Sequence, residues 1–127
     1  EKVDGGRMNC EVDDFRELKE ALEDMCAALE RDAVPANAVF DCKLVARELL
    51  CNALRYGGGC TAFRAEKHDN EVVIRVRSAN NFRPPEHSAC SAVDAERGRG
   101  LYLVDALTVS RTFSEEDGIC VIVRILP

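Results

Sequence analysis

Glu48-Leu-Leu-Cys-Asn52-Ala-Leu-Arg55-Tyr56 is the stretch that decides the fold, and it closes a helical pattern that begins at Ala36. Residues four apart stack on one face of a helix, so Glu48 and Asn52 are expected to hold a carboxylate and a carboxamide side by side. On the helix alone, a polar pair satisfied by its neighbours is the better-supported interpretation. Features elsewhere in the chain decide whether the pair has a function.

The faces of this predicted helix differ in polarity. Glu48 and Asn52 share the side that carries the apolar residues Leu44, Val45 and Leu49. A separate stripe that can face water is basic and comprises Lys43, Arg47 and Arg55. The pair is therefore expected to point towards a core or a cleft.

Size and composition favour a single soluble domain over residues 1–127. The chain has 127 residues, of which 46% are hydrophobic, which is enough for one core and too few for two. No stretch approaches the roughly 18 apolar residues of a membrane span, and no secretory signal is recognisable. The net charge of -6 argues against nucleic-acid binding, because such proteins usually carry a basic surface. The first residue is Glu1 rather than Met, which suggests a trimmed chain or a domain of a longer protein.

The seven cysteines predict a reducing, cytoplasmic location rather than a disulfide framework. They are odd in number, widely spread and free of any C-x-x-C pair. Cys26, Cys42 and Cys51 fall inside helical patterns, where a reduced cysteine packs as a small hydrophobe. Zinc is not expected, since His68 and His87 lie in polar stretches away from paired cysteines.

The first half of the chain predicts a short strand followed by two helices. The strand falls within residues 1–12, after a Gly-Gly pair. Asp14 with Glu17 forms a capping-box pattern, which predicts a helix from about Asp14 to Arg31. Asn37 is expected to cap the second helix, and the glycine run at 57–59 is expected to end it at Tyr56.

The second half predicts two hairpins separated by a loop and a short helix. Alternating apolar residues over 60–65 and 72–76 indicate the first hairpin. Residues 80–99 show no period and predict a long loop, and residues 101–107 predict a short helix. Residues 108–113 and 119–126 indicate the second hairpin. This order predicts a two-layer α/β sandwich with helices on one face of a mainly antiparallel sheet.

A glycine-rich turn supplies a second chemical clue. Gly98-Arg99-Gly100-Leu101 opens the short helix, and backbone N–H groups at a helix N-terminus favour a phosphate. Arg97 and Arg99 add positive charge there. A single side-chain oxygen, such as that of Asn52, can suffice for Mg²⁺ when phosphate and water complete its shell. Glu48, one turn earlier, is then placed to orient or deprotonate a nucleophile.

Two of these motifs resemble the GHKL, or Bergerat-fold, ATPase family. Glu48-Leu-Leu-Cys-Asn52-Ala is similar to the family's N-box, and Gly98-Arg-Gly-Leu101 is similar to its G2 box beyond the ATP lid. The resemblance spans about Asp13 to Ile125. The compact length, the preceding amphipathic helix and the lack of a phosphoacceptor-histidine domain most resemble the anti-sigma-factor serine kinase branch.

The resemblance implies a Bergerat α/β sandwich that binds Mg-ATP between the N-box helix and a lid over about residues 82–97. It implies that Asn52 binds Mg²⁺ and that Glu48 is the general base. The other residues implied to bind the nucleotide are Arg55, Tyr56, Ser78, Asn80, Arg97, Gly98, Arg99, Gly100 and Leu101. The branch implies a sigma factor and a STAS-domain antagonist as partners, a serine of the antagonist as phosphoacceptor, and a homodimer.

The adenine-binding part departs from the family pattern. The family's D-x-G-x-G box corresponds to residues 78–82, where Ser78 stands at the aspartate and Asn80 and Phe82 stand at the glycines. Ser78 can accept a hydrogen bond without the charge assistance of a carboxylate. Near the last strand, Ile119 follows Gly118 where the family often has threonine.

Three functions remain open at this point. One is an ATP-dependent serine kinase and anti-sigma factor, favoured by Glu48, Asn52 and Gly98-x-Gly100. Another is a protein-binding module of the same fold that has lost nucleotide recognition, favoured by Ser78, Phe82 and Ile119. The third is the ATPase domain of a larger sensor or regulator.

Overall fold

The computed structural model describes residues 2–4, 7–57, 60–78, 102–114 and 118–125. Residues 102–107 form a short helix that precedes β5. The other elements, in chain order, are β1 (Lys2–Asp4), β2 (Arg7–Val12), α1 (Phe15–Arg31), α2 (Ala36–Asn52), the π-helical turn η1 (Ala53–Gly57), β3 (Thr61–His68), β4 (Glu71–Ser78), β5 (Ser110–Ser114) and β6 (Gly118–Arg124).

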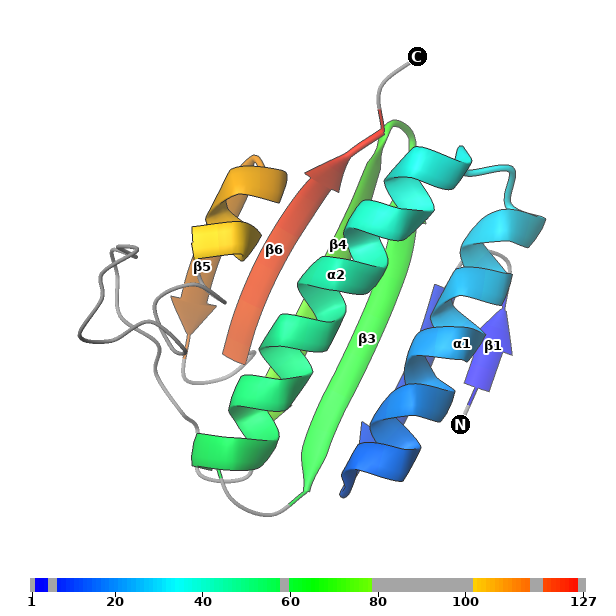
Figure 1. The fold of residues 1–127 in the computed structure, drawn as a ribbon. Coiled ribbons are helices and arrows are strands. Elements are labelled where there is room, and N and C mark those ends of the chain that lie inside the picture. The colour runs from blue at the N-terminus through cyan, green and yellow to red at the C-terminus, as the bar shows by residue number, and fades with distance from the viewer. Residues whose placement is uncertain (1, 5–6, 58–59, 79–101, 115–117, 126–127) are drawn as a thin grey trace.

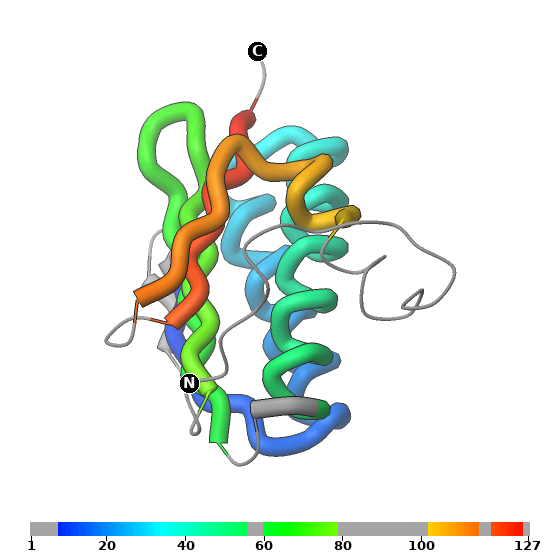
Figure 2. Tube along the Cα trace, turned by 90° about the vertical axis from the view of Figure 1, so that its left-hand side faces the viewer, coloured from blue at the N-terminus to red at the C-terminus, as the bar shows by residue number. Residues whose placement is uncertain are grey.

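The strands form a six-stranded sheet in the order β1-β2-β3-β4-β6-β5, and every neighbouring pair is antiparallel. Helices α1 and α2 cover the same face of this sheet (Figure 1). Seen from the side, the strands form one layer and the two helices form another (Figure 2). The predicted two-layer α/β sandwich is therefore confirmed for the described residues. None of their helices is both long enough and apolar enough to span a membrane.

The core lies between the helices and the sheet because the strands alternate in polarity. Phe63 and Ala65 of β3 and Ile74 and Val76 of β4 are buried, and their neighbours are more exposed. Phe63 pairs with Val76 and Ala65 with Ile74, so apolar side chains lie opposite one another on the helix-facing side. The hairpin predicted from the two-residue period is confirmed.

Helix α1 begins where the capping pattern predicts. Asp14 is the N-cap, and its carboxylate accepts a hydrogen bond from the Glu17 backbone N–H at 2.8 Å. The Glu17 carboxylate reaches back to the backbone N–H of Asp13, also at 2.8 Å, one residue before the N-cap. Two N–H groups at the helix start are thereby satisfied.

The end of α1 is a Schellman motif built on an alanine. The backbone N–H of Val34 donates to the Leu29 carbonyl and that of Ala33 donates to the Glu30 carbonyl. Ala33 has a φ of 62°, in the left-handed region that glycine usually occupies. Val34 is buried in the core, and its burial keeps the Schellman motif formed. The left-handed conformation of Ala33 is nevertheless strained for alanine.

Helix α2 begins at Ala36 as predicted, but its N-cap residue and its C-terminal end differ from the prediction. Pro35, not Asn37, is the N-cap, and its carbonyl accepts from the Val39 backbone N–H at 3.0 Å. Asn37 lies within the first turn and makes no capping bond, so its predicted capping role was wrong. At the other end the α-helix stops at Asn52 and residues 53–57 form η1. The backbone stays helical at Ala53 (φ -63°, ψ -41°), but the hydrogen bonds widen to the π pattern.

The remaining elements follow the predictions with small shifts. The expected first strand is β2, and it pairs with a short strand, β1, that the sequence did not predict. The second hairpin spans 110–114 and 118–124 rather than 108–113 and 119–126. The short helix is confirmed over residues 102–107. The predicted loop at 80–99 lies outside the described residues.

Gly118 fixes how β6 starts against β4. Its φ is 75°, and a Cβ added there would lie 2.4 Å from the Val76 carbonyl oxygen and 2.7 Å from the Arg77 Cα. Both the backbone conformation and the close approach therefore require glycine.

Opposite exchanges at Gly118 and Ala33, two of the three left-handed positions in the described chain, should have opposite effects. Gly118→Ala should lower the free energy of unfolding by at least ~2 kcal/mol, because it adds strain and a clash with β4. Ala33→Gly should raise it by up to ~1 kcal/mol, since glycine relieves the strain at the end of α1. Urea denaturation of both variants measures this. A Gly118→Ala variant with an unchanged free energy of unfolding would contradict the close approach of β6 to β4.

Candidate functional site

The buried polar residues of the described chain gather at one end of the sandwich. They are Asn52, Thr61 and Ser78, and each is 8% exposed or less. Asn52 is the last residue of α2, Thr61 the first of β3 and Ser78 the last of β4. Figure 1 shows these three element ends together at the lower end of the molecule, and η1 contacts β4 there. We call this region the polar end.

Thr61 and Ser78 face one another across the first hairpin. They are direct partners in the β3–β4 register, on the side of the sheet that carries Phe63 and Val76. Opposed residues in an antiparallel pair have Cβ atoms about 4.5–5.5 Å apart. The Thr61 hydroxyl is fully buried and has no hydrogen-bond partner among the described residues. A buried hydroxyl without a hydrogen bond lowers the free energy of unfolding by about 1–3 kcal/mol, so the presence of threonine at this position requires an explanation.

The predicted faces of α2 are confirmed. Val45 and Leu49 are fully buried, and Leu44 is half-buried. Glu48 is half-buried and Asn52 is 8% exposed, so the pair lies at the margin of the core. The basic stripe is exposed as predicted, and it comprises Lys43, Arg47 and Arg55.

The side chains of Glu48 and Asn52 are not held by neighbours in the described chain. No hydrogen bond joins either of them to another described residue. The satisfied polar pair favoured from the helix alone therefore has no support in the described part of the structure. A buried carboxamide oxygen with spare acceptor capacity is a suitable ligand for a hard cation.

The helical cysteines are protonated packing groups. Cys42 is fully buried, and burial raises the pKa of its thiol to about 12. Burial also raises the pKa of Cys51, and the nearby Glu48 carboxylate adds to the effect. Cys26 and Cys51 pack against the core while partly exposed, as expected for small hydrophobes. The cysteines that the structure describes are all free thiols.

Several of the predicted nucleotide-binding residues lie outside the described part of the chain. Arg55 is exposed on η1, and Tyr56 belongs to the same turn. The predicted lid over 82–97, including Phe82, lies outside the described residues. The same holds for Asn80, Arg97, Gly98, Arg99, Gly100 and Leu101. Their roles stay predictions, and the described part of the site consists of the polar end.

Beside the polar end, β6 contributes an apolar side chain. Ile119 is 3% exposed and pairs with Val76 of β4. Together with Phe63 of β3 it forms a buried apolar row next to the Thr61–Ser78 pair across three neighbouring strands. The two hydroxyls therefore lie against the apolar core.

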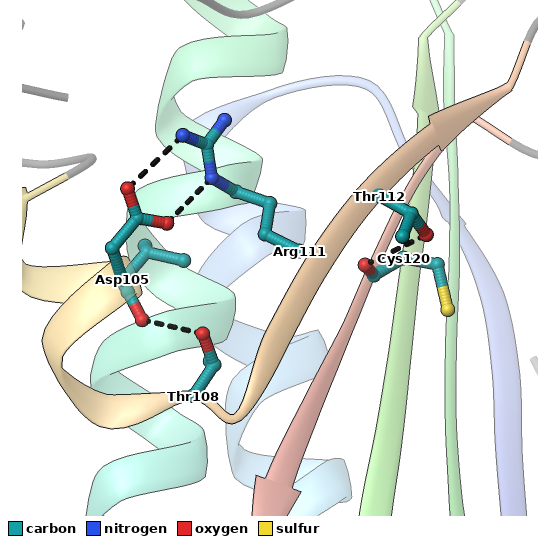
Figure 3. Close-up of polar contacts among 6 residues, drawn as sticks. Asp105, Thr108, Arg111, Thr112 and Cys120 are labelled. Atoms are coloured by element: carbon teal, nitrogen blue, oxygen red, sulfur yellow. Dashed lines mark hydrogen bonds and ion pairs between the residues drawn. The ribbon is translucent and has the colours of Figure 1, made fainter. Parts of the chain in front are cut away.

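An ion pair anchors the helix at 102–107 to β5. Arg111 donates from Nε to Asp105 Oδ1 at 2.6 Å and from a terminal nitrogen to Oδ2 at 3.0 Å (Figure 3). The Arg111 side chain is only 9% exposed. Thr108 donates to the Val104 carbonyl at 2.8 Å, and Val104 is fully buried. The helix that follows Gly98–Leu101 is thus fixed by a two-point bond and a core residue.

The sequence patterns indicated neither the burial of the Thr61 hydroxyl nor the Asp105–Arg111 pair. Thr61 lies within the alternation predicted over residues 60–65, which assigned it no role. A hydroxyl on a face otherwise carrying Phe63 and Ala65 was the available signal. Asp105 and Arg111 are six residues apart across a helix–strand boundary, where no periodicity links them. Only the three-dimensional path of the chain brings them together.

Chemically, the polar end offers oxygen ligands rather than a closed metal site. The described residues contain no group of three His, Cys, Asp or Glu side chains that could hold an ion. The Asn52 oxygen and the Glu48 carboxylate instead suit a ligand that brings its own oxygens, such as a Mg²⁺–phosphate complex.

The chain matches a known protein family over most of its length. Residues 10–125 match the protein family described as the histidine kinase-like ATPase domain. That range contains α1, α2 and strands β3 to β6. A search of curated proteins finds no match to the chain.

The Asp105–Arg111 pair should be measurably stabilising. Asp105→Asn should lower the free energy of unfolding by about 1–2 kcal/mol, because it leaves a largely buried guanidinium with a neutral partner. Glu20→Gln is a matched control, since it breaks the exposed Arg16–Glu20 pair at 3.8 Å and should cost less than about 0.5 kcal/mol. Chemical denaturation compares the two. Equal losses would show that the burial of Arg111 contributes nothing.

Proposed function

Since the chain belongs to the histidine kinase-like ATPase family, we propose that it binds Mg-ATP at the polar end and is a serine protein kinase of the anti-sigma-factor type. Its protein substrate would be a STAS-domain antagonist, and its second partner a sigma factor. The observation that supports this most is the clustering of Asn52, Thr61 and Ser78, since buried polar groups concentrated at one end of a fold favour a ligand site.

Asn52 is the proposed Mg²⁺ ligand. It fits that group because its carboxamide is buried at the end of α2 and has no hydrogen bond to another described residue. When bound, Mg²⁺ supplies charge neutralisation for the phosphates. Glycine-rich residues 98–101, with Arg97 and Arg99, are proposed to bind the phosphate tail through backbone N–H groups and positive charge. Arg55 and Tyr56 are proposed to lie close by.

Glu48 is the proposed general base. It lies one helical turn before Asn52 and is half-buried, so its carboxylate is partly shielded and close to the proposed phosphate position. In the proposed reaction it accepts the proton of the antagonist's serine hydroxyl. The serine oxygen forms a bond to the γ-phosphorus, and the bond from that phosphorus to the β–γ bridging oxygen breaks. ADP leaves with the electron pair.

A second candidate is a protein-binding module that uses no nucleotide. The observation that favours it is the chemistry of the base-binding end. Ser78 is neutral, and Ile119 is a buried apolar residue beside Val76. Such a module would contact the sigma factor through the same sandwich, alone or as a homodimer. An ATPase domain within a larger sensor would share the ATP site but lack the antagonist as substrate.

Mg-ATP should stabilise the protein. A nucleotide at 100 times its Kd adds ~2.7 kcal/mol to the free energy of unfolding, which raises Tm by about 10 °C. Asn52→Ala should abolish most of this shift, whereas Asn37→Ala, at an exposed position of the same helix, should retain it. Thermal-shift titration with Mg-ATP measures both. Absence of any shift at millimolar nucleotide would exclude the kinase and leave the binding module.

Phosphotransfer should depend on Glu48. Glu48→Gln should slow transfer from ATP to a STAS-domain protein by about 10²–10⁴-fold, since it removes the proton acceptor. The Mg-ATP thermal shift should persist in this variant. The matched control is Glu30→Gln, at an exposed position of α1. Incubation with radiolabelled ATP gives the rates, and binding without transfer in the unmodified protein would leave ATP as a structural ligand only.

A further inference from the structure

The outer side of strand β2 is only partly covered by β1. Strand β1 pairs with Arg7, Met8 and Asn9, and on that side no strand of the described chain pairs with residues 10–12. The other side of residues 10–12 pairs with β3. Backbone N–H and C=O groups point alternately to the two sides of a strand, so this stretch can hydrogen-bond to a further strand. At the usual rise per residue, the open edge is about 10 Å long.

A cavity of about 510 Å³ lies beside this open edge. Cys10 and Glu11 of β2 line it from the sheet, and Glu17, Glu20 and Ala21 of α1 line it from the helix. Ala21 is buried and Cys10 is half-buried, whereas Glu11 and Glu20 are exposed. The cavity, which we call the β2 edge groove, therefore has an apolar floor and a polar rim. Its volume is typical of ligand sites, which have about 300–1,000 Å³.

The β2 edge groove is acidic. Three glutamates line it, and no Lys, Arg or His of the described chain does. Glu17 uses one carboxylate oxygen to accept from the Asp13 backbone N–H, and its second oxygen can still accept. Glu20 forms a 3.8 Å ion pair with Arg16, whose side chain is 75% exposed, and such pairs contribute little. A cation that enters the groove therefore meets carboxylates whose charge is only weakly compensated.

A second copy of this chain fits the groove poorly if it pairs through the same edge. Such pairing would bring Glu11, Glu17 and Glu20 of both copies together, and like charges at close range repel. The open backbone edge requires an extended segment, and the carboxylates favour a basic one. Lysine and arginine suit the groove because their apolar stems can pack on Cys10 and Ala21 while their charged ends reach the rim.

We propose that the β2 edge groove binds an extended basic segment of a partner protein, which adds a strand to the sheet along residues 10–12. Successive side chains of such a strand point to opposite faces of the sheet. One face carries Glu17 and Glu20 on α1, and the other carries Glu11, so basic residues of the segment find a carboxylate on both faces. The inference is carried by the groove and does not rest on nucleotide binding.

Binding of labelled five-residue peptides to the 127-residue chain, measured by fluorescence anisotropy, tests the proposal. The basic probe Lys-Val-Lys-Val-Lys should bind at least about tenfold more tightly than Glu-Val-Glu-Val-Glu. It should also bind at least about tenfold more tightly than Lys-Pro-Lys-Pro-Lys, which has the same charge but whose prolines cannot donate to a strand. Equal binding of the two basic peptides would show an acidic patch only and overturn strand addition.

Two charge reversals on α1 test the position of the site. Glu20→Lys should weaken binding of Lys-Val-Lys-Val-Lys by about fivefold, because it reverses a charge at the rim. Glu30→Lys is the matched control, since Glu30 is equally exposed on α1 but lies outside the groove. It changes the net charge by the same amount and should leave the affinity unchanged. Equal losses in the two variants would show a general charge effect and overturn the assignment to the groove.

Hydrogen exchange of the backbone N–H groups distinguishes strand addition from charge attraction. Saturation with Lys-Val-Lys-Val-Lys should slow exchange of an outward-pointing N–H within residues 10–12 by at least about tenfold, because the added strand accepts its hydrogen bond. Unchanged exchange throughout residues 10–12 would overturn the proposal. Protection of this stretch that rises with protein concentration in the absence of peptide would assign the edge to a second copy, and would also overturn it. All these measurements are made without ATP, so their outcome leaves the proposed function untouched.

Discussion

The antiparallel register of β3 and β4 is the constraint on which the rest of the structure depends. It places Phe63 opposite Val76 and, one rung further, Thr61 opposite Ser78. Side chains alternate with a period of two, so a slip of one residue would turn these groups to the other face and expose the aromatic ring. Burial of the apolar rung therefore also fixes two hydroxyls beneath the end of α2. The same strand register therefore stabilises the core and forms the polar end.

Other contacts hold the neighbouring strands. Gly118 lets β6 begin in close contact with β4, which brings Ile119 beside Val76. Further along the sheet and away from the polar end, the Asp105–Arg111 bond fixes the helix at 102–107 to β5. The polar end is thus built on strands and helices whose positions are set by packing and close backbone approach, which is how a precise ligand site is supported.

Local sequence patterns predicted most of the fold because they depend on neighbouring residues. The Asp14 cap and the alternation around Phe63 are confirmed. The errors occur where a local pattern is ambiguous or too short to show a period. Asn37 has the chemistry of a cap, yet the Pro35 carbonyl already accepts the first helical bond. Strand β1 has three residues, too few to show a period, and exists because β2 offers it a pairing edge.

By itself the sequence determined the family, the Glu48–Asn52 pair and its side of the helix, since a helical face follows from spacing alone. Only the tertiary structure decided that Asn52 lies at the same end of the sandwich as Thr61 and Ser78 and that the Thr61 hydroxyl is left without a partner in the described chain. These facts depend on strand pairing across the sheet and on which groups lose water when the layers pack. Neither is encoded in the order of adjacent residues.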